Sequence, residues 1–178
     1  MLALGTKLPE FSLVDTVTGK LVSASDVNIK NGVLVMFICN HCPFVIHIRS
    51  ELVKVANEAL NAGVTVVAIN SNSIESHPQD GPAHMKELAQ AEGWRFPFLF
   101  DDTQRAAKSF TAACTPDIFL FDARRELAYR GQFDDSRPSN GKPVTGADLR
   151  AAIAAVVAKK PVSQAQKPSI GCNIKWKS

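Results

Sequence analysis

The sequence predicts a single α/β domain in which helices flank a central mixed β-sheet. The uninterrupted apolar run at residues 33–38 and the largely apolar run at residues 64–70 are typical of strands that are buried on both faces. Between them, apolar residues recur at helical spacing from Val45 to Leu60, so the order strand, helix, strand implies a right-handed crossover between parallel neighbours. Residues 118–121 and 127–131 flank a turn and predict an antiparallel hairpin, which makes the sheet mixed.

The remaining elements can be placed in chain order. Residues 11–14 and 21–23 flank Thr18-Gly19-Lys20 and predict an N-terminal β-hairpin. The helix after the first buried strand is expected to end near residues 61–63, and residues 71–82 to form a long polar loop. The other expected elements are a helix over about 83–91, a strand over 96–100, a short helix capped by Asp102-Thr103 that runs to Phe110, a loop over 134–143 and a helix over 147–159.

Length and composition set the domain organisation. The chain has 178 residues, of which 46% are hydrophobic, which is enough for one sizeable core. From Pro161 onward the composition turns polar and proline-punctuated. We therefore expect one domain over residues 1–160 and a C-terminal tail over residues 161–178 that packs on or near it.

The charge pattern excludes several partners. The net charge of +3 comes from 20 basic and 17 acidic residues, a small excess that does not indicate a nucleic-acid surface.

No run approaches the ~20 apolar residues needed to span a bilayer, and Lys7, Glu10 and Asp15 interrupt the N-terminal segment, so no secretory leader is expected. The sequence predicts a cytoplasmic protein without nucleic-acid or membrane partners. In a reducing cytosol, its four cysteines favour catalysis or sensing over permanent disulfides.

Cys39 and Cys42 form a CxxC motif at the junction between the first buried strand and the helix that follows. At a helix N-terminus, unpaired N–H groups and a partial positive charge favour thiolate over thiol. Cys39 is therefore the expected nucleophile, and Cys42, one turn further in, is the expected partner that attacks a mixed disulfide. His41 lies beside the nucleophile, where its imidazole can stabilise the thiolate and so raise the reduction potential.

Other interpretations of the motif are a half zinc site, a structural bridge or two buried thiols. A tetrahedral zinc site usually includes a second CxxC or an HxxxH, and neither occurs here, so we expect no metal and no cofactor. His47 can reach the motif only if its helix face points that way, and His77 and His84 flank a proline-rich loop where we expect them to be exposed. Metal handling nevertheless stays open as an alternative, with these candidate ligands: Cys39, His41, Cys42, His47, His77 and His84.

Four segments from the start of the chain to its end carry a resemblance: Gly5–Leu13, Cys39–Val45, Cys114–Asp117 and Pro168–Lys177. On the basis of these segments, the chain resembles the thioredoxin-like superfamily and, within it, the peroxiredoxin-like branch (AhpC/TSA, redoxin) that carries a thioredoxin-type CxxC. The resemblance covers nearly the whole chain. It implies a thioredoxin fold with an N-terminal β-hairpin and a C-terminal extension.

The resemblance also implies roles for Thr115 and Pro116. An X–Pro bond is cis in only about 5% of cases, but thioredoxin-like proteins place a cis-proline at this point, facing the CxxC, to present backbone groups to an extended substrate. We therefore expect Pro116 to be cis and Thr115 to contact substrate. Cys114 then comes near the redox site, and Cys172 lies in the tail. Either one can be an additional redox thiol, the two can pair with each other, or both can simply fill packed positions.

These features predict a thiol-disulfide oxidoreductase that contributes to redox homeostasis. Its expected partners are a protein or small-molecule disulfide and a cellular dithiol that donates electrons. The first alternative is a thiol peroxidase, but the Pro-x-x-x-Thr-x-x-Cys motif of peroxiredoxins, aligned on Cys42, meets Val35 and Cys39 instead of proline and threonine. A non-catalytic thioredoxin-fold module is a further alternative, and it leaves the joint presence of the dithiol and the Thr-Pro turn unexplained.

Overall fold

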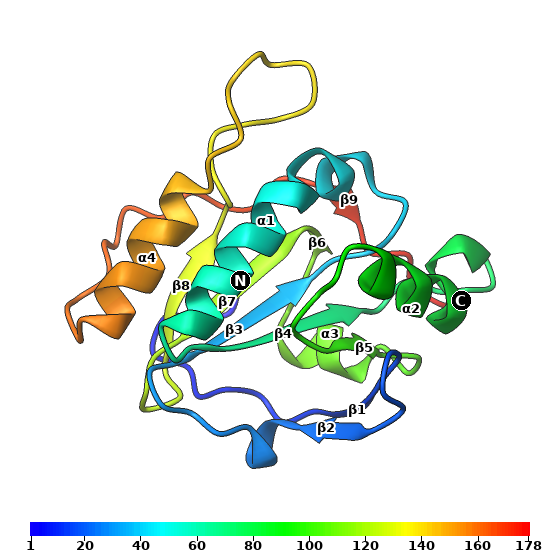
Figure 1. Ribbon diagram of the computed structural model, residues 1–178, viewed down its shortest axis with the longest axis horizontal. Coiled ribbons are helices and arrows are strands. Elements are labelled where there is room, and N and C mark those ends of the chain that lie inside the picture. The colour runs from blue at the N-terminus through cyan, green and yellow to red at the C-terminus, as the bar shows by residue number, and fades with distance from the viewer.

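A seven-stranded mixed sheet forms the centre of the protein in the computed structural model, which describes residues 1–178 (Figure 1). Its strands are β1 (Ser12–Asp15), β2 (Leu21–Ser23), β3 (Val33–Phe37), β4 (Thr65–Asn70), β5 (Phe98–Phe100), β7 (Asp117–Phe121) and β8 (Leu127–Gly131). A separate two-stranded sheet contains β6 (Cys114–Thr115) and β9 (Cys172–Asn173). The helices are α1 (Pro43–Asn61), α2 (Pro82–Ala91), α3 (Arg105–Ser109) and α4 (Ala147–Val157), with short 3₁₀ turns η1 (Ala24–Asp26) and η2 (Pro78–Asp80).

The strand order is β2-β1-β5-β4-β3-β7-β8. Strand β3 pairs with β4 in parallel and with β7 in antiparallel orientation, and β4 pairs in parallel with β5. The β1–β2 and β7–β8 pairs are the two predicted hairpins. The mixed sheet, the parallel crossover through α1 and the thioredoxin fold are therefore confirmed.

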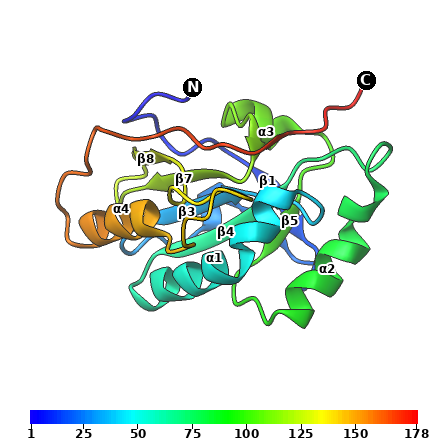
Figure 2. The same cartoon turned by 90° about the horizontal axis from the view of Figure 1, so that it is seen from above.

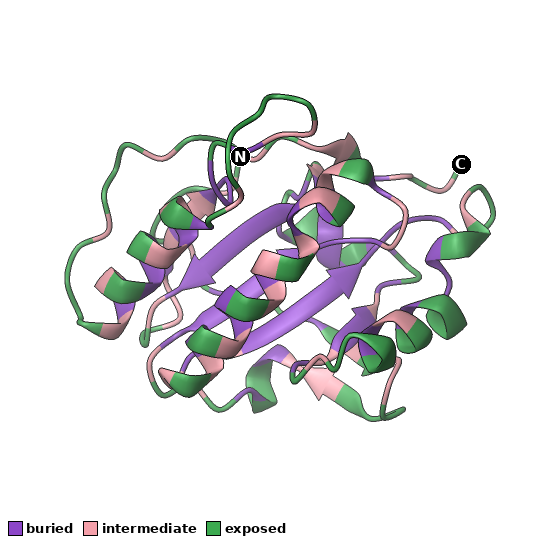
Figure 3. Cartoon of the chain, turned by 45° about the horizontal axis from the view of Figure 1, so that its top comes forward, coloured by how far each residue is buried: buried purple, intermediate pink, exposed green.

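The two faces of the sheet carry two separate cores, because successive side chains of a strand point to opposite faces. Leu34 and Met36 of β3 belong to the core that also includes residues of α1, α2 and α4. Val35 and Phe37 belong to the other core, which includes α3 and the N-terminal segment. Figure 2 shows the sheet between these layers, and Figure 3 shows the buried strands behind helices whose outer faces are exposed. None of the helices is both long enough and apolar enough to cross a membrane.

The cap of α3 differs from the prediction. Instead of Asp102 or Thr103, the buried Asp101 accepts the amide N–H groups of Ala106 and Ala107, at 3.3 and 3.0 Å. Asp102 instead forms an exposed ion pair with Lys177 of the tail, at 2.7 Å. The prediction fails because a capping carboxylate can also reach a helix end from several residues upstream when the intervening chain turns back.

Replacing Asp101 with alanine should lower the free energy of unfolding by about 2 kcal/mol, because two amides of the first turn and the Ser71 hydroxyl, 2.7 Å from the carboxylate, lose their acceptor. Asp102→Ala is the matched control, since it removes a carboxylate at the next position but only an exposed ion pair. Chemical denaturation of the two variants would distinguish them. Equal stabilities would contradict the assignment of the cap to Asp101.

The C-terminal tail runs back across the molecule as an extended chain after α4 (Figure 2). Its strand β9 pairs with β6, and the main chain of Lys175 forms hydrogen bonds with the Asn72 side chain and the Ser73 amide. Ile174 is 1% exposed, whereas Ile170 and Trp176 are 54% and 44% exposed. Ile174 therefore enters one core, Val162 and Cys172 pack against the other, and Ile170 and Trp176 stay at the surface.

Candidate active site

The CxxC motif lies between β3 and α1, where both cysteines are buried: Cys39 is 1% exposed and Cys42 is fully buried. Cys42 is the N-cap of α1, so Cys39 lies before the helix and not in its first turn. This corrects the expectation that Cys39 would sit at the helix N-terminus with Cys42 one turn further in. The physical reason is that the amides of Asn40 and His41 donate to the carboxylate of Asp80, which holds the intervening residues in a turn.

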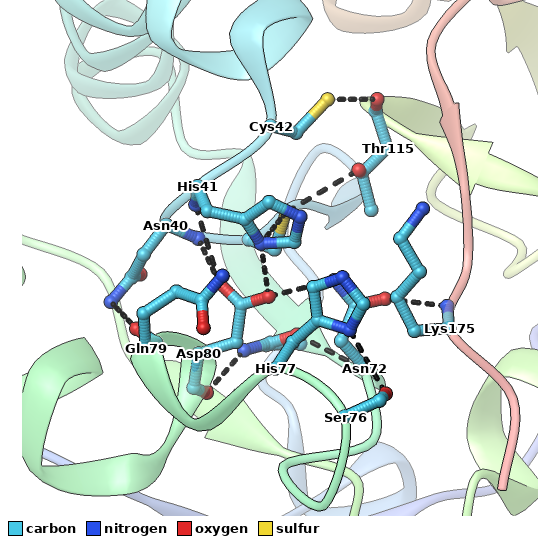
Figure 4. A network of polar contacts seen from close by, with 12 residues as sticks. Asn40, His41, Cys42, Asn72, Ser76, His77, Gln79, Asp80, Thr115 and Lys175 are labelled. Atoms are coloured by element: carbon cyan, nitrogen blue, oxygen red, sulfur yellow. Dashed lines mark hydrogen bonds and ion pairs between the residues drawn. The ribbon is translucent and has the colours of Figure 1, made fainter.

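Asp80 anchors this turn from η2 (Figure 4). Its side chain is completely buried, and its Oδ1 accepts the amides of Asn40 and His41 at 2.9 and 3.2 Å. Its Oδ2 accepts from the Asn72 side chain at 2.9 Å and forms an ion pair with Nδ1 of His41. The Asn70 side chain donates to the Asp80 carbonyl at 2.7 Å. A buried carboxylate with this many donors fixes both the loop and the imidazole.

Sequence reasoning missed Asp80. The residue lies in the polar loop that follows β4, far along the chain from the motif that it contacts. Its neighbours Pro78, Gly81 and Pro82 indicate only a loop. One signal was available: β3 and β4 are parallel, so the segments after them meet at one edge of the sheet, and side chains from both can converge there.

The His41 imidazole lies next to the dithiol. Its Nδ1 is 3.9 Å from Sγ of Cys39, and its side chain is 22% exposed. The ring of His77 stacks on it with 4.7 Å between centroids, so His77 is only partly exposed, unlike the predicted solvent-facing residue. The predicted neighbourhood of Cys39 and His41 is thus present, with Asp80 and His77 added to it.

The other two histidines lie elsewhere. His47 hydrogen-bonds to Ser136 of the loop before α4, at 2.7 Å. His84 is exposed on α2, as expected. The residues that could hold a metal ion are Cys39, His41 and Asp80, whose potential ligand atoms all lie within 4.8 Å of one another. Cys42 is not part of that group, and a tetrahedral zinc site would need a fourth ligand.

Thr115 and Pro116 face the dithiol, and the bond between them is cis, as predicted. The Thr115 carbonyl accepts a hydrogen bond from Sγ of Cys42 at 3.2 Å, and its hydroxyl lies 3.5 Å from Sγ of Cys39. Thr115 therefore contacts both sulfurs, as Figure 4 shows for Cys42. Its Cα is paired with that of Cys172, so the protein's own tail lies along the strand that was expected to receive substrate.

The interaction between the two thiols separates their pKa values. It lowers the pKa of Cys42 to about 4 and raises the pKa of Cys39 above its ordinary value, and burial and the Asp80 charge raise the latter further. The contacts that the two thiols make with other residues favour the opposite arrangement, in which Cys42 keeps the proton and Cys39 carries the negative charge. Cys42 faces a carbonyl oxygen, which pairs with a thiol and not with a thiolate, whereas Cys39 faces a hydroxyl and an imidazole that can both donate.

Cys114 and Cys172 differ in their relation to the dithiol. In the β6–β9 pair, Cys172 is opposite Thr115 and Cys114 is opposite Asn173, so the two cysteine side chains point to opposite faces. Burial, followed by the neighbouring Cys42 thiol, raises the pKa of the Cys172 thiol to about 11. The Cys114 thiol donates instead to the Pro116 carbonyl at 3.5 Å. The structure thus brings Cys172 to the site and leaves Cys114 beside it.

Comparisons with known proteins bear on the family and the fold of the chain. The model of the AhpC/TSA family matches residues 4–130. An uncharacterized conserved protein from Geobacillus kaustophilus is 51% identical with a TM-score of 0.97, and the match covers 99% of this chain and 94% of that one. A hypothetical protein from Sinorhizobium meliloti 1021 is 48% identical with a TM-score of 0.97, over 100% of this chain and 97% of that one.

A more distant structure is similar in fold alone. The thioredoxin domain of a thiol-disulfide oxidoreductase from Bacteroides vulgatus is 21% identical with a TM-score of 0.60, over 73% of this chain and 89% of that chain. No curated protein matches the chain.

Proposed function

Because the chain belongs to the AhpC/TSA family, and because its two buried thiols both contact Thr115, we propose that it is a thiol-disulfide oxidoreductase whose redox couple is Cys39 and Cys42. The shared contact with Thr115 carries the proposal, since it brings both sulfurs to one buried site beside the cis-proline turn. Four free cysteines suit a reducing compartment, and we place the protein in the cytoplasm.

The reaction begins with Cys39. Its thiolate attacks a substrate disulfide, a bond forms between Cys39 and one substrate sulfur, and the other substrate sulfur leaves and takes a proton. Cys42 then attacks Sγ of Cys39, the mixed disulfide breaks, and the second substrate thiol is released. The substrate gains two electrons and the protein is left with a Cys39–Cys42 disulfide. A cellular dithiol must return the two electrons before the next cycle.

The contacts of the two thiols support this order. Thr115 and His41 can donate to a Cys39 thiolate, at 3.5 and 3.9 Å, while the Thr115 carbonyl keeps Cys42 as a thiol until its turn. No arginine hydrogen-bonds to either cysteine in the structure. Glu51, the first carboxylate along α1 after the motif, bonds to Arg150 and Lys54 and not to Cys42.

A partly apolar hollow next to the dithiol suits an extended protein substrate. Residues of α1 and the cis-proline turn line it together with the loop before α4 and the tail, including Phe44, Ile48, Pro116, Phe133 and Ile170. Polar residues complete the lining, among them Gln132, Asp134, Ser136 and Arg137. This hollow could contact a residue next to the substrate disulfide while the disulfide itself approaches Cys39.

The test is the reduction potential of the dithiol, measured by equilibration in glutathione or dithiothreitol buffers, with insulin reduction and peroxide consumption measured on the same sample. A defined two-electron couple and insulin reduction without rapid peroxide consumption are expected. Absence of a Cys39–Cys42 disulfide at any potential would overturn the proposal.

A thiol peroxidase is the second candidate, and the position of Cys42 favours it. Cys42 is at the N-cap of α1, where the helix terminus stabilises a thiolate. Against it, Cys39 stands where the family motif has a threonine, and no arginine contacts Cys42. Rapid peroxide consumption that is lost in Cys42→Ser but kept in Cys39→Ser would establish this function instead.

Replacing His41 with phenylalanine should make the dithiol more reducing by about 30 mV, which corresponds to about 1.4 kcal/mol. The variant keeps a ring to stack on His77, but it removes the donor near Cys39 and leaves the Asp80 charge, which raises the pKa of Cys39. His84→Phe, at an exposed position of α2, is the control. An unchanged potential in His41→Phe would contradict the electrostatic role of the imidazole.

A further inference from the structure

Cys172 comes from the C-terminal tail, but its side chain lies against the dithiol. It is paired with Thr115 across β6 and β9, and Thr115 is the residue whose carbonyl accepts from Cys42 at 3.2 Å. Cys172 also packs against the buried core cluster that contains Cys39 and Cys42, and the Cys42 thiol contributes to its raised pKa. Cys42 therefore has Cys39 and Cys172 as its two cysteine neighbours.

We propose that Cys172 is a third redox cysteine. It attacks Cys42 in the Cys39–Cys42 disulfide and so moves the disulfide towards the protein surface. The proposal rests on the proposed function, because that function generates the first disulfide. It adds a catalytic residue and a second disulfide, between Cys42 and Cys172, to the cycle.

The step is an internal thiol-disulfide exchange. The Cys172 thiolate attacks Sγ of Cys42, the Cys42–Cys172 bond forms, and the Cys39–Cys42 bond breaks with Cys39 as the leaving thiolate. The proton that Cys172 loses balances the proton that Cys39 gains. No net oxidation occurs, so the step needs no oxidant beyond the substrate disulfide that formed the first bond. Cys42 has to be the central sulfur of this exchange, and it is the one that has both other cysteines as neighbours.

Burial explains what the exchange achieves. Cys39 is 1% exposed and Cys42 is fully buried, so the active loop has to move before a substrate or an external dithiol can reach this pair. Cys172 is partly exposed, and its neighbours in the tail lie on the surface. A Cys42–Cys172 disulfide therefore presents one accessible sulfur to the electron donor. Substrate would thus react at Cys39, and the electron donor would react at Cys172.

The redox state of Cys42 also controls the third thiol. In the reduced protein, burial, followed by the neighbouring Cys42 thiol, raises the pKa of Cys172 to about 11, so Cys172 is protonated near neutral pH. Once Cys42 is in a disulfide, its thiol no longer contributes to the raised pKa. Lys175 lowers the pKa of Cys172 in both states. Oxidation of the dithiol thus makes the attacking thiol easier to deprotonate.

Gly171 allows the tail to lie close enough to Thr115 for this role. A Cβ at Gly171 would lie 2.0 Å from the Thr115 carbonyl oxygen and 2.6 Å from its carbon, so no other residue fits without moving the strand. On the far side of Cys172, Ile174 is buried and the amide of Lys175 donates to the side chain of Asn72. Both flanks of Cys172 are therefore anchored.

Gly171→Ala should detach β9, because the added methyl group would overlap the Thr115 carbonyl group. We expect the yield of the Cys42–Cys172 disulfide to fall about tenfold as a result of this overpacking. Gln164→Ala is the control, since it changes an exposed residue of the same tail. The yield in each variant would be measured by peptide mapping after mild oxidation. Equal yields in the two variants would show that the register of β9 does not position Cys172.

The proposal itself can be tested by the same mapping on the full chain. Trypsin places Cys39 and Cys42 together in peptide 31–49, Cys114 in peptide 109–124 and Cys172 in peptide 160–175, because the proline after Lys160 and Lys167 blocks cleavage there. A Cys39–Cys42 disulfide thus stays within one peptide, whereas a Cys42–Cys172 disulfide links two. The protein would be oxidised with one equivalent of a disulfide, alkylated and digested without reductant.

We expect wild type to give the 31–49/160–175 linkage, Cys39→Ser to give far less of it because no Cys39–Cys42 disulfide precedes the exchange, and Cys172→Ser to stop at the internal Cys39–Cys42 disulfide. Cys114→Ser, which removes a cysteine of β6 that faces away from the dithiol, should behave as wild type. If Cys39–Cys42 forms in wild type but the linkage does not, Cys172 is not a redox residue and the proposed function still holds. If wild type forms no Cys39–Cys42 disulfide, it is the proposed function that fails.

Discussion

Cys39→Ser should lose insulin reduction by several orders of magnitude, because the variant has no thiolate to form the mixed disulfide with substrate. The loss is expected in the catalytic step and not in folding. Serine is close in size to cysteine, and position 39 lies outside α1 and outside β3. The free energy of unfolding, measured by chemical denaturation of the reduced proteins, should therefore change much less than the activity.

Cys42→Ser should fail differently. Its Cys39 still attacks, but no second thiol resolves the mixed disulfide, so covalent adducts with substrate accumulate on Cys39 and disappear on addition of dithiothreitol. Serine is among the preferred N-cap residues, so the start of α1 should be preserved. Intact-mass measurement after incubation with a peptide disulfide would detect the adduct in Cys42→Ser and not in Cys39→Ser.

The pair of variants also decides which cysteine is the nucleophile. The interaction between the thiols can place the negative charge on Cys42, which the N-cap position favours, or on Cys39, which the Thr115 and His41 contacts favour. Trapped adducts in Cys39→Ser and none in Cys42→Ser would reverse the assignment. Cys114→Ser is the control for the loss of a part-buried cysteine and should retain the activity.

Most of the fold could be predicted from the sequence because it depends on local periodicity. The apolar runs of β3 and β4 and the helical spacing of α1 are properties of short segments, and they determine the sheet and the crossover. The two-residue strands β6 and β9 were not predicted, since so short a pair has no periodicity of its own. They form only because the tail returns to the cis-proline turn.

The candidate site divides in the same way. The CxxC, His41 and the Thr-Pro turn are local motifs, and the structure brings all of them together. Asp80 was missed, and Cys172 could not be assigned, because their roles depend on contacts between segments far apart in the chain. No spacing rule in one sequence identifies such partners. The start of α1 was misplaced for the same reason, since the Asp80 carboxylate takes the amides that would otherwise begin the helix.

One network joins these unpredicted parts. Asp80 holds the CxxC turn and accepts a hydrogen bond from the side chain of Asn72. The side-chain oxygen of Asn72 in turn accepts the amide of Lys175 in the tail. The dithiol and the segment that carries Cys172 are thus positioned through a single pair of side chains. A change at Asp80 should therefore affect both the active loop and the tail.

Asp80→Ala should lower the free energy of unfolding by about 4 kcal/mol. The substitution removes the acceptor of two backbone amides, of the Asn72 amide group and of the His41 ring, and buried donors without partners cost about 1–3 kcal/mol each when water cannot replace the acceptor fully. Denaturant unfolding of the reduced protein would measure the loss. Glu75→Ala removes an exposed carboxylate of the same loop and should leave the stability unchanged.

Asp80→Asn separates the structural role of this residue from its charge. Asparagine can still accept the amides of Asn40 and His41 through its carbonyl oxygen, but it carries no negative charge. Because the Asp80 charge raises the pKa of Cys39, its removal should lower that pKa, and the alkylation of Cys39 by iodoacetamide should begin at lower pH than in wild type. A purely structural role predicts instead that alkylation rises at all pH values as the loop opens, without a shift in the profile. A shifted profile in Asp80→Asn, together with lost stability in Asp80→Ala, would show that one buried carboxylate both shapes the CxxC turn and restrains the reactivity of its first thiol.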